Sequence, residues 1–580
     1  MIMAGEYSTK YRWTLAPEQP VLAQHLANEL GISQLLAQCL LNRGLSEPDP
    51  IARFLDPRLK NLSDPFLLPN MAAAVDRLFV ARHNRESVVI FGDYDVDGVS
   101  ATALLTESLR HLGWRVEYYL PHRIEEGYGL SMAAVENCLR RFQTTLLLAV
   151  DCGSTAVDSI ALLRSQGIDV LVIDHHQVSQ PMPAAVALVN PQLAPAGAVS
   201  FRELCSVGLA FKLVHALVKR GREPGSPEFF DFDVRPLLDL VALGTIADVV
   251  PLNGENRILV RRGLEWLNHT ARPGLLALRE VAKITGKIGG YEVGFQLAPR
   301  LNAAGRLENA LEALQLLLAA DATTARPLAE RLDAHNRERQ EIERGIARTL
   351  IEKVRGRFDP TRDFVIVEGD LAWHIGVVGI VASRVLQEFY RPTIIFGSDG
   401  EHWRGSGRSV EGFDLAAALR DCTELLVGHG GHAMAAGLSI LPNNVDKFRA
   451  RLNEIAQRCL SLAQLRPALR LDAPVTCAEL TIERVHELEK LQQTGIGNPP
   501  VQLGLFKVAH ERPLQRFGTE KKHVRLWVND GTVTRDAVWW GGGPGQLPVG
   551  SFDLAVTPQL NYFNGSVAVQ LKVLDWRSEP

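Results

Sequence analysis

Three aspartates stand two residues apart in one short turn, a spacing that could bind a cation. They are Asp93, Asp95 and Asp97 in the segment VVIFGDYDVDG, residues 88–98. Because carboxylates this close repel one another, a cation that neutralises them would stabilise the turn. For this segment taken alone, a solvated acidic turn is the alternative interpretation.

Further acids and histidines follow three other apolar segments. They are Asp151 after Leu146–Val150, Asp174-His175-His176 after Val170–Ile173, and Asp248 after Leu237–Gly244. We interpret these segments, like Val88–Phe91, as buried strands whose ends or following loops carry the polar residues. The carboxyl ends of parallel strands lie side by side at one edge of a sheet. Convergence of these acids and the two histidines there indicates a metal site, with two metals favoured over one.

The residue types indicate which metals and which chemistry to expect. Carboxylate oxygens suit Mg²⁺ or Mn²⁺, and imidazole shifts the preference toward Mn²⁺. Two metals about 3.5–4 Å apart need a bridging carboxylate, for which Asp151 is the best candidate. They would polarise a phosphodiester and lower the pKa of a bound water. Of His175 and His176, one can bind metal while the other faces a substrate phosphate, with Asp174 fixing the ring tautomer.

Several arginines are candidates for binding phosphate. Arg123 follows the apolar segment that ends at Leu120 and should lie at the same edge of the sheet as the acids. Arg300 and Arg306 flank Asn302. A guanidinium can hold a phosphate with two parallel hydrogen bonds. A surface salt bridge is the alternative for each arginine taken alone.

Two glycine-rich segments add a second candidate surface for phosphate. In GSGRS (Gly405–Ser409), we expect the glycines to let backbone N–H groups approach an anion while Arg408 supplies a guanidinium. The other segment, GHGGHAMAAG, covers Gly428–Gly437. Because both fall in one predicted domain, they favour a ligand surface there.

The elements that position these residues alternate between strand and helix patterns. Helices are predicted at Val99–Leu112 and Ser131–Phe142, with a strand at Arg115–Leu120 between them. This alternation predicts an α/β fold with a mainly parallel sheet and helices on both faces. The turn GDYDVDG lacks the GxGxxG pattern of dinucleotide-binding folds, so we expect no nicotinamide cofactor.

We divide the chain into five segments. They are an N-terminal lead-in (1–70) that should pack on the first large domain, a catalytic domain (71–265), a helical connector (266–357), a second α/β domain (358–455) and a C-terminal β domain (465–580). In the connector, Ala329–Arg357 predicts a long helix that joins two lobes, with a surface helix of the first domain as the alternative. In the second α/β domain we predict strands at Phe364–Val367 and Thr393–Phe396 and a helix at Gly376–Phe389.

The C-terminal segment changes to short alternating strands. Asn564-Gly565 separates two of them and is a strong signal for a two-residue hairpin. We predict an OB-like, nucleic-acid-binding β-barrel, with a β-sandwich module as the alternative. Its candidate contacts to a DNA strand are Arg516, Lys521, Lys522, His523, Arg525 and Trp527.

The composition is that of a globular protein of several domains. The chain has 580 residues, of which 46% are apolar and 22% charged, and this length predicts about three or four domains. No apolar run reaches ~18 residues and the N-terminus lacks the apolar core of a signal peptide, so we expect no membrane partner. Seven scattered cysteines without a CxxC pair are typical of a reducing cytoplasm. A net charge of −4 means that nucleic-acid binding must come from local patches.

Taken in order, the motifs resemble those of the DHH phosphoesterase superfamily. They are GDYDVDG (92–98), VDCG (150–153), DHH (174–176) and GTIADVVPL (244–252). WHIGVVGIVASR (373–384), GSGRS and GHGGHAMAAG resemble its companion DHHA1 domain. With PRLNAAGR (299–306) and the C-terminal barrel, the arrangement is similar to the single-strand-specific DNA exonucleases of that superfamily. The resemblance covers essentially the whole chain and is weakest at the N-terminus.

The resemblance implies a 5′→3′ exonuclease that releases 5′-mononucleotides from single-stranded DNA with two Mg²⁺ or Mn²⁺ ions. It also implies a role in recombination and repair, with single-strand-binding protein and a RecQ-like helicase as partners. We expect a cytoplasmic monomer. The resemblance assigns the metal ligands as Asp95, Asp97, Asp151, His175 and Asp248, with Asp93 a further ligand or a supporting acid. These five and His176 are the predicted catalytic residues, and the predicted phosphate contacts are His176, Arg123, Arg300, Arg306, Ser406 and Arg408.

A cleft between the two predicted lobes would explain selectivity for single strands, if it admits one strand but no duplex. Two other functions compete with the exonuclease. A phosphodiesterase for cyclic dinucleotides or very short oligonucleotides would not need the C-terminal barrel. A non-enzymatic DNA-binding scaffold would not need a complete set of metal ligands. The barrel and the ligand set therefore favour the exonuclease.

Overall fold

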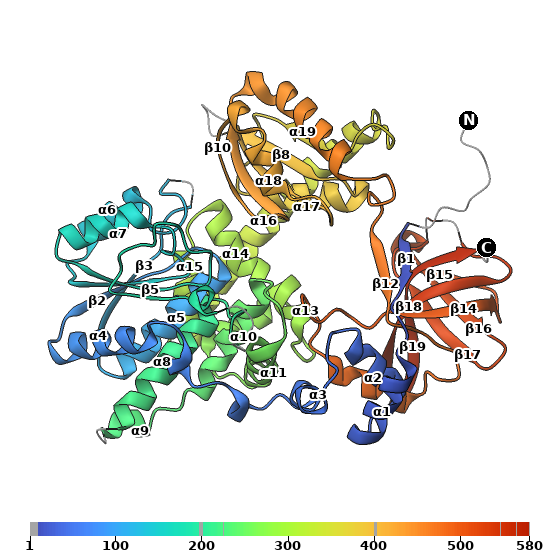
Figure 1. Cartoon of the computed structure of the whole chain (residues 1–580), viewed down its shortest axis with the longest axis horizontal. Helices are drawn as coiled ribbons and strands as arrows, with labels where there is room; N and C mark the ends of the chain where they lie inside the picture. Colours follow the sequence, from blue (N-terminus) through green and yellow to red (C-terminus); the bar gives the residue numbers. More distant parts are fainter. Residues whose placement is uncertain are drawn as a thin grey trace. The chain divides into compact units, whose positions relative to one another are not determined.

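The computed structural model describes residues 10–123, 125–195, 201–223, 226–398, 403–543, 545, 547–563 and 565–578. The chain forms two units (Figure 1). The first unit consists of Ala52–Arg339 with Gln493–Pro499, and the second of Met1–Ile51, Gln340–Gln492 and Pro500–Pro580. Among the residues described, no helix combines the length and the apolar character needed to span a membrane.

A five-stranded parallel sheet in the order β3-β2-β4-β5-β6 forms the centre of the first unit. Its strands are β2 (Ser87–Phe91), β3 (Arg115–Tyr119), β4 (Leu146–Val150), β5 (Asp169–Ile173) and β6 (Ala187–Val189). Alternate side chains of a strand enter different cores. Val88 and Ile90 face one core, whereas Val89 and Phe91 face the other. The predicted parallel sheet, buried on both faces, is confirmed.

Helices cover both faces of this sheet (Figure 1). One face packs against α4 (Met71–His83), α5 (Val96–His111) and α8 (Ser206–Arg222). The other packs against α6 (Met132–Arg141) and α7 (Val157–Ser165). The helix predicted at Val99–Leu112 begins three residues earlier in the structure, so that Asp97 lies inside its first turn.

The segment before Asp248 is a helix, and the strand predicted at Leu237–Gly244 is wrong. Helix α10 runs over Leu238–Ala247 with Asp248 as its C-cap residue, and all residues from Leu238 to Thr245 are buried. A continuous apolar run is compatible with a buried strand and with a buried helix, so periodicity could not distinguish them. Because α10 packs against α5, α8 and α11 (Gly254–Asn268), Asp248 comes from a helix end and not from the sheet.

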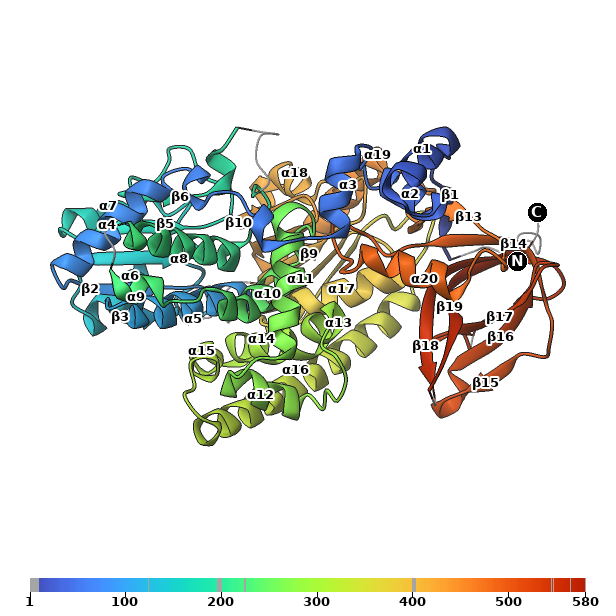
Figure 2. The same ribbon diagram turned by 90° about the horizontal axis from the view of Figure 1, so that it is seen from below.

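The remaining helices of the first unit lead to a long linking helix. They are α9 (Pro227–Phe230), α12 (Pro273–Val281), α13 (Gly290–Glu292), α14 (Ala298–Leu307) and α15 (Leu311–Leu317), with a π-helical turn η5 (Val293–Leu297) between α13 and α14. The long helix α16 covers Ala322–Arg355 (Figure 2). Because the boundary between the two units falls within α16, at residues 339–340, the prediction of a long helix joining two lobes is confirmed.

The second unit contains a mixed five-stranded sheet in the order β10-β11-β9-β8-β7. Its strands are β7 (Ile366–Gly369), β8 (Thr393–Ser398), β9 (Trp403–Arg408), β10 (Leu426–Gly431) and β11 (Ala435–Ile440). One face packs against α17 (Val378–Phe389) and the end of α16, and the other against α18 (Leu415–Arg420) and α19 (Val445–Cys459). The predicted strands and helix of this domain are present, with bounds shifted by a few residues.

The GSGRS segment lies in a central strand, so the prediction that its backbone approaches an anion is wrong. Strand β9 pairs with β8 on one side and β11 on the other, and this ladder uses its backbone N–H groups. The glycines instead permit close packing. A Cβ atom on Gly405 would lie 2.5 Å from Phe396 Cε1, and one on Gly407 would lie 2.6 Å from Leu415 Cδ2.

From Lys10 to Ile51, the prediction that the N-terminal segment packs on the first large domain is wrong. Strand β1 (Arg12–Leu15) pairs in parallel with β12 (Ala468–Leu471), and Trp13 Nε1 donates a hydrogen bond of 2.8 Å to Asp575 Oδ2. Helices α1 (Pro20–Leu30), α2 (Gln34–Leu41) and α3 (Pro48–Leu55) follow. Partners more than 400 residues away leave no local sequence pattern, which explains the error.

The C-terminal segment forms a sheet in the order β13-β14-β18-β19-β17-β16-β15. Its strands are β13 (Ala473–Pro474), β14 (Leu503–His510), β15 (Gln515–Phe517), β16 (His523–Asn529), β17 (Thr534–Trp539), β18 (Phe552–Phe563) and β19 (Ser566–Ser578), and α20 (Ile482–Leu488) lies between β13 and β14 in the chain. An additional pairing of β14 with β16 closes the sheet into a barrel, which favours the OB-like prediction over the β-sandwich. The predicted hairpin joins β18 to β19, although Asn564 itself lies outside the described residues.

Candidate metal centre

The turn after β2 places its three aspartates around the N-terminus of α5. Asp95 is the N-cap residue, and its Oδ1 atom accepts hydrogen bonds from the backbone N–H groups of Asp97 (2.9 Å) and Gly98 (3.1 Å). Glycine is needed at position 98 because a Cβ atom there would lie 2.7 Å from the carbonyl oxygen of Asp93. The positive end of the helix dipole favours carboxylates at this position.

Asp97 is buried and its carboxylate is held by a second helix terminus. Its Oδ2 atom accepts from the backbone N–H of Ser206 (2.7 Å) and its Oδ1 atom from that of Val207 (2.9 Å), at the start of α8. A Cβ atom on Gly244 of α10 would lie 3.1 Å from Asp97 Oδ1, so this glycine lets α10 approach the site. Burial, and after it the charge of Asp95, raises the pKa of Asp97 to about 6.

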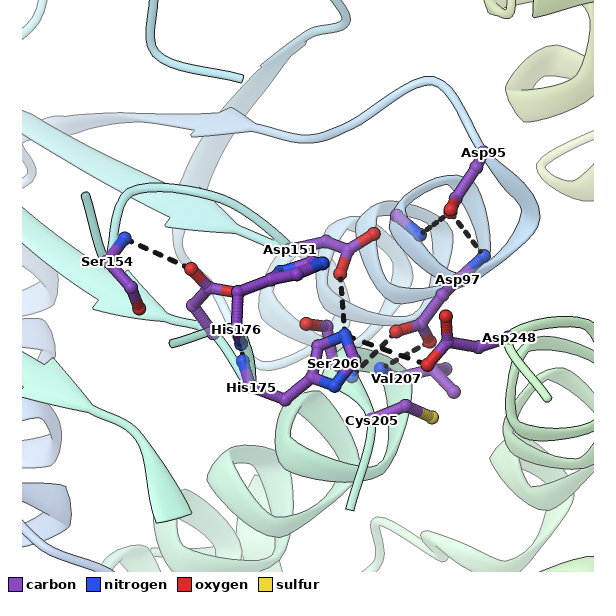
Figure 3. A network of polar contacts seen from close by, with 12 residues as sticks. Asp95, Asp97, Asp151, Ser154, His175, His176, Cys205, Ser206, Val207 and Asp248 are labelled. Carbon is purple, nitrogen blue, oxygen red and sulfur yellow. Dashed lines mark hydrogen bonds and ion pairs between the residues drawn. The ribbon is translucent and has the colours of Figure 1, made fainter. Parts of the chain in front are cut away.

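Asp151, His175 and Asp248 meet although they come from three separate segments (Figure 3). His175 Nε2 lies 3.6 Å from Asp151 Oδ1 and 3.6 Å from Asp248 Oδ2. Asp151 has a φ of 65°, in the left-handed region that costs a non-glycine residue about 1–3 kcal/mol. Its backbone N–H donates to the carbonyl oxygen of Ile173 on β5, which holds the strained residue in place.

The second histidine is oriented by a buried carboxylate. His176 Nδ1 lies 2.8 Å from Asp174 Oδ1, and the backbone N–H groups of His175, His176 and Ser154 also donate to the Asp174 carboxylate. Burial by itself would lower the pKa of His176, but the hydrogen bond and the charge of Asp174 raise it to about 9. An imidazolium held in this way can donate its other ring N–H to an anion, which is the division of roles predicted for the DHH motif.

The ligand atoms form three overlapping groups, each with its members within 4.8 Å of one another. The groups are Asp93-Asp95-Asp151, Asp97-His175-Asp248 and Asp151-His175-His176. Asp151 and His175 each belong to two of them. The structure therefore brings together all seven acids and histidines predicted for the metal site and its DHH histidine pair: Asp93, Asp95, Asp97, Asp151, His175, His176 and Asp248.

The donor set fits a hard divalent cation. Within the part of the chain that the structure describes, Asp93 Oδ1, Asp151 Oδ1 and Asp248 Oδ2 are buried and have no hydrogen-bond partner. Burial has the largest effect on the pKa of each of these carboxyls, and the charges of neighbouring aspartates raise the pKa further. Together they raise the pKa of Asp93 and Asp151 well above the ordinary value and that of Asp248 to about 9. A cation would supply further positive charge and coordinate the oxygens that accept no hydrogen bond.

The predicted arginines of the first unit lie in different surroundings. The Arg123 guanidinium lies over the ring of Tyr94, 5.0 Å from its centroid, beside the acidic turn. The charges of Arg123 and Arg306 both oppose the effect of burial, which raises the pKa of the Tyr94 hydroxyl. Arg300 instead donates to Asp333 Oδ1 at 2.9 Å. Arg123 and Arg306 therefore lie near the metal site, and the phosphate role of all three stays a prediction.

Ser406 and Arg408 belong to the second unit. Arg408 Nη1 donates to Ser406 Oγ (3.0 Å) and to the carbonyl oxygen of Gly407 (2.8 Å). A Cβ atom on Gly379 of α17 would lie 2.9 Å from Ser406 Oγ and 3.0 Å from Arg408 Nη2, so this glycine makes room for both side chains. It stays a prediction that Ser406 and Arg408 contact the DNA strand on which the carboxylates act. The predicted cleft between the lobes also stays a prediction.

Sequence reasoning missed two tyrosines at the site. The hydroxyl of Tyr128 donates to the carbonyl oxygen of Asp151 at 3.1 Å and lies 3.3 Å from His176 Nδ1. Tyr94 packs against Tyr128 in an edge-to-face contact. Tyr94 lies inside the acidic motif and Tyr128 lies between two glycines, so an aromatic residue within or close to a motif was the available signal.

Comparison with known proteins agrees with this geometry. Residues 87–245 match the DHH family N-terminal domain, residues 362–458 the DHHA1 domain, and residues 471–575 the RecJ OB domain. The chain is 35% identical to the single-stranded-DNA-specific exonuclease RecJ of Bacillus subtilis, over 98% of this chain and 71% of that protein.

Two solved structures of RecJ from Thermus thermophilus are also similar. The structure in complex with Mn²⁺ has a TM-score of 0.84 and 31% sequence identity, over 98% of this chain and 80% of that chain. The structure in complex with Mg²⁺ has a TM-score of 0.79 and 29% identity, over 98% and 79%.

Proposed function

The chain belongs to the RecJ family of single-stranded-DNA-specific exonucleases, and we propose that it hydrolyses single-stranded DNA at the carboxylate–histidine site. The observation that carries this proposal is the convergence of Asp93, Asp97, Asp151, His175 and Asp248, with three buried carboxylate oxygens that lack hydrogen-bond partners among the described residues. A closed OB barrel in the second unit supports a polymer substrate over a cyclic dinucleotide.

Mg²⁺ or Mn²⁺ is the cofactor, because the ligands are carboxylates and imidazole and because the related RecJ structures hold these ions. Asp93, Asp95, Asp97, Asp151, His175 and Asp248 would hold the ions. When bound, the ions neutralise the carboxylates, polarise the phosphodiester and lower the pKa of water. Asp151 is the proposed bridging residue because its carboxylate belongs to two ligand groups.

The protein's own residues orient the substrate. His176, protonated and held through Nδ1 by Asp174, can donate from Nε2 to a phosphate oxygen. The Tyr128 hydroxyl donates to the carbonyl oxygen of Asp151 and lies beside the ring of His176. These two contacts restrict the positions of Asp151 and His176. Arg123, stacked over Tyr94, places a positive charge beside the acidic turn, where a phosphate of the strand would otherwise be repelled.

Family membership supports several finer properties. We propose 5′→3′ polarity, release of 5′-mononucleotides, and a role in DNA recombination and repair in the cytoplasm. Single-strand-binding protein and a RecQ-like helicase are the proposed partners. Ser406 and Arg408 of the second unit are the proposed contacts to the 5′ end of the strand, together with Arg300 and Arg306.

A degradation assay tests the proposal. A single strand of about forty nucleotides, labelled at either end, is incubated with Mg²⁺ or Mn²⁺, with the matching duplex as control. The 5′ label should appear at once as a mononucleotide and the 3′ label as a slowly shortening ladder. Attack on the duplex, shortening from the 3′ end first, or cleavage of dinucleotides alone would overturn the proposal.

The Asp151→Asn variant tests the site itself. We expect turnover to fall by at least about a thousandfold, because the proposed bridging oxygen loses its charge, while binding of the strand persists. Binding is measured by fluorescence anisotropy and turnover by nucleotide release. More than a trace of activity would remove the bridging role from Asp151.

A further inference from the structure

The helix that carries PRLNAAGR lies along the metal site. It runs without a break through α13, η5 and α14, from Gly290 to Leu307. Near its start, a Cβ atom on Gly294 would lie 3.9 Å from Ile246, two residues before the ligand Asp248. Near its end, a Cβ atom on Gly305 would lie 2.8 Å from the carbonyl oxygen of Tyr94 in the acidic turn. The helix therefore packs against segments that carry ligands from both sides of the site.

Two pairs of residues on this helix, which we together call the stripe, reach solvent at least in part. Tyr291 and Phe295 form its first part, Asn302 and Arg306 its second, and all four are exposed or partly exposed. Tyr291 is 64% exposed and Phe295 71%, although both are large aromatic side chains. Their rings stack on each other with centroids 5.0 Å apart and planes inclined by 28°. The stripe thus has an aromatic end and a polar, cationic end.

The aromatic pair is held on a fixed backbone. The backbone N–H of Gly289 donates to Glu292 Oε2 at 2.8 Å, which caps the helix. At the π-helical turn, Arg300 Nη1 donates to the carbonyl oxygen of Gln296 at 2.7 Å while Arg300 Nε pairs with Asp333. π-Helical turns interrupt regular helices often at functional positions. Two exposed rings on a rigid turn lose little conformational entropy when a ligand stacks on them.

Two further apolar residues, both in segments close to Asp248, are exposed. Val249 directly follows the ligand Asp248 and is 60% exposed. Ile496 is 54% exposed, and its carbonyl oxygen accepts a hydrogen bond of 2.8 Å from the backbone N–H of Leu252. Val249 adjoins the proposed ligand Asp248 and Gly294 packs on Ile246, so one short segment both contacts this helix and carries a ligand.

We propose that Tyr291 and Phe295 form a platform on which bases of the single strand stack, away from the bond that is cleaved; this rests on the proposed nuclease function. Single-stranded nucleic acid offers flat bases and negatively charged phosphates at regular intervals, and the stripe offers rings and then Asn302 and Arg306 in that order. Phe295 and Arg306 are eleven positions apart, about 16 Å along a helix, which a strand of several nucleotides can span. Duplex DNA keeps its bases stacked inside and could not use the platform.

Steady-state kinetics and binding of the double variant Tyr291→Ala/Phe295→Ala test the platform. With a 3′-labelled oligothymidylate of about twenty nucleotides, we expect KM and the dissociation constant to rise about tenfold or more, with a smaller change in kcat. The matched control is Phe230→Ala, which removes an exposed ring (56%) from α9 and should change neither constant. Unchanged KM and affinity in the double variant would overturn the proposal.

Two further variants separate stacking from general apolar contact. Phe295→Trp keeps a flat ring and should bind the strand at least as well as the wild type, whereas Phe295→Leu keeps apolar area and should bind as weakly as Phe295→Ala. Equal binding by the Leu variant and the wild type would contradict stacking and favour a protein-docking surface instead.

Substrates with abasic nucleotides supply the complementary test. Abasic positions several nucleotides from the 5′ end should weaken binding to the wild type and have no further effect on the double variant. Additive losses would show that the bases and the rings act independently. If the wild type releases no nucleotide from any strand, the nuclease proposal fails; if it does and the variants behave as the wild type, only the platform fails.

Discussion

At the residue scale, the site is a set of acids buried in an environment that disfavours their charged form. Asp93, Asp97 and Asp151 are almost fully buried, each no more than 2% exposed. Burial and mutual repulsion raise the pKa values of all three. A protein without a cofactor would lose stability through such a cluster, so its presence is explained by a bound cation. Asp174 is the exception, because hydrogen bonds and the His176 charge outweigh burial and lower its pKa.

Asp174→Asn should uncouple His176 from its carboxylate. The His176 pKa, about 9 in the wild type, should fall toward its ordinary value of 6.5 in the metal-free protein, because the Asp174 charge that stabilises the imidazolium is lost. We expect kcat/KM for single-stranded DNA to fall by about 10- to 100-fold. NMR titration of the histidine ring measures the pKa directly. An unchanged His176 pKa would contradict the role of Asp174, whatever happens to activity.

At the element scale, close helix packing keeps the ligands within reach of one another. Gly98, Gly244 and Gly305 each sit where a Cβ atom would approach a neighbour to less than 3.0 Å. Gly305 matters most for geometry, since it sets the distance between α14 and the carbonyl oxygen of Tyr94.

Gly305→Ala should therefore push α14 away from the acidic turn. We expect a loss of about 1–3 kcal/mol in the free energy of unfolding and a fall in kcat/KM of up to about 100-fold, since ligands and Arg306 shift together. Gly345→Ala is the matched control, because a Cβ atom at this position of α16 would have no neighbour within 4 Å among the described residues. That variant should be more stable by about 0.5–1 kcal/mol with unchanged activity. Urea unfolding and nucleotide release measure both; equal effects of the two substitutions would contradict the packing argument.

Some elements were predictable from local pattern and others were not. Short apolar runs predict the strands before Asp93, Asp151 and Asp174. The helices between these strands predict that the strands pair in parallel. Helix α10 was not predictable as a helix, since an apolar run looks the same in a buried strand. The role of Gly405 and Gly407 was also missed, because glycine in sequence indicates either an anion loop or close strand packing, and only the neighbouring Phe396 and Leu415 decide.

At the scale of the whole molecule, contacts between residues far apart in the chain determine which unit a segment joins, and local sequence patterns do not predict these contacts. The parallel pairing of β1 with β12 ties the N-terminal segment to the second unit. The segment Gln493–Pro499 lies with the first unit, although its neighbours in the chain on both sides lie with the second. The convergence of the proposed ligands was predictable nonetheless, since they fall in a few local motifs and a parallel sheet brings strand ends together. Only Asp248 reaches the site by another route, from the end of helix α10.

The charge balance of the metal centre makes a prediction for the stability of the whole protein. In the metal-free protein, the pKa of Asp97 rises from 3.8 to about 6 and that of Asp248 from 3.8 to about 9 on folding. The folded state then binds more protons than the unfolded state between these values, so stability present below about pH 4 is lost as the pH rises to about 9. For Asp97 alone, this pKa shift corresponds to a loss of about 3 kcal/mol in the free energy of unfolding across that pH range. The raised His176 pKa acts in the same direction between pH 6.5 and about 9.

Urea unfolding of protein stripped with a chelator should therefore show a midpoint that falls steadily from pH 5 to pH 8.5. Protein saturated with Mn²⁺ should show a much smaller fall, because the cation stabilises the ionised carboxylates that the metal-free fold disfavours. Asp248→Asn removes one of the acids and should make the metal-free protein more stable than the wild type at pH 8.5 and less dependent on pH. If the metal-free and Mn²⁺-saturated wild type showed parallel pH profiles, Mn²⁺ would not be stabilising the ionised carboxylates, and the buried acids would not be a cation site.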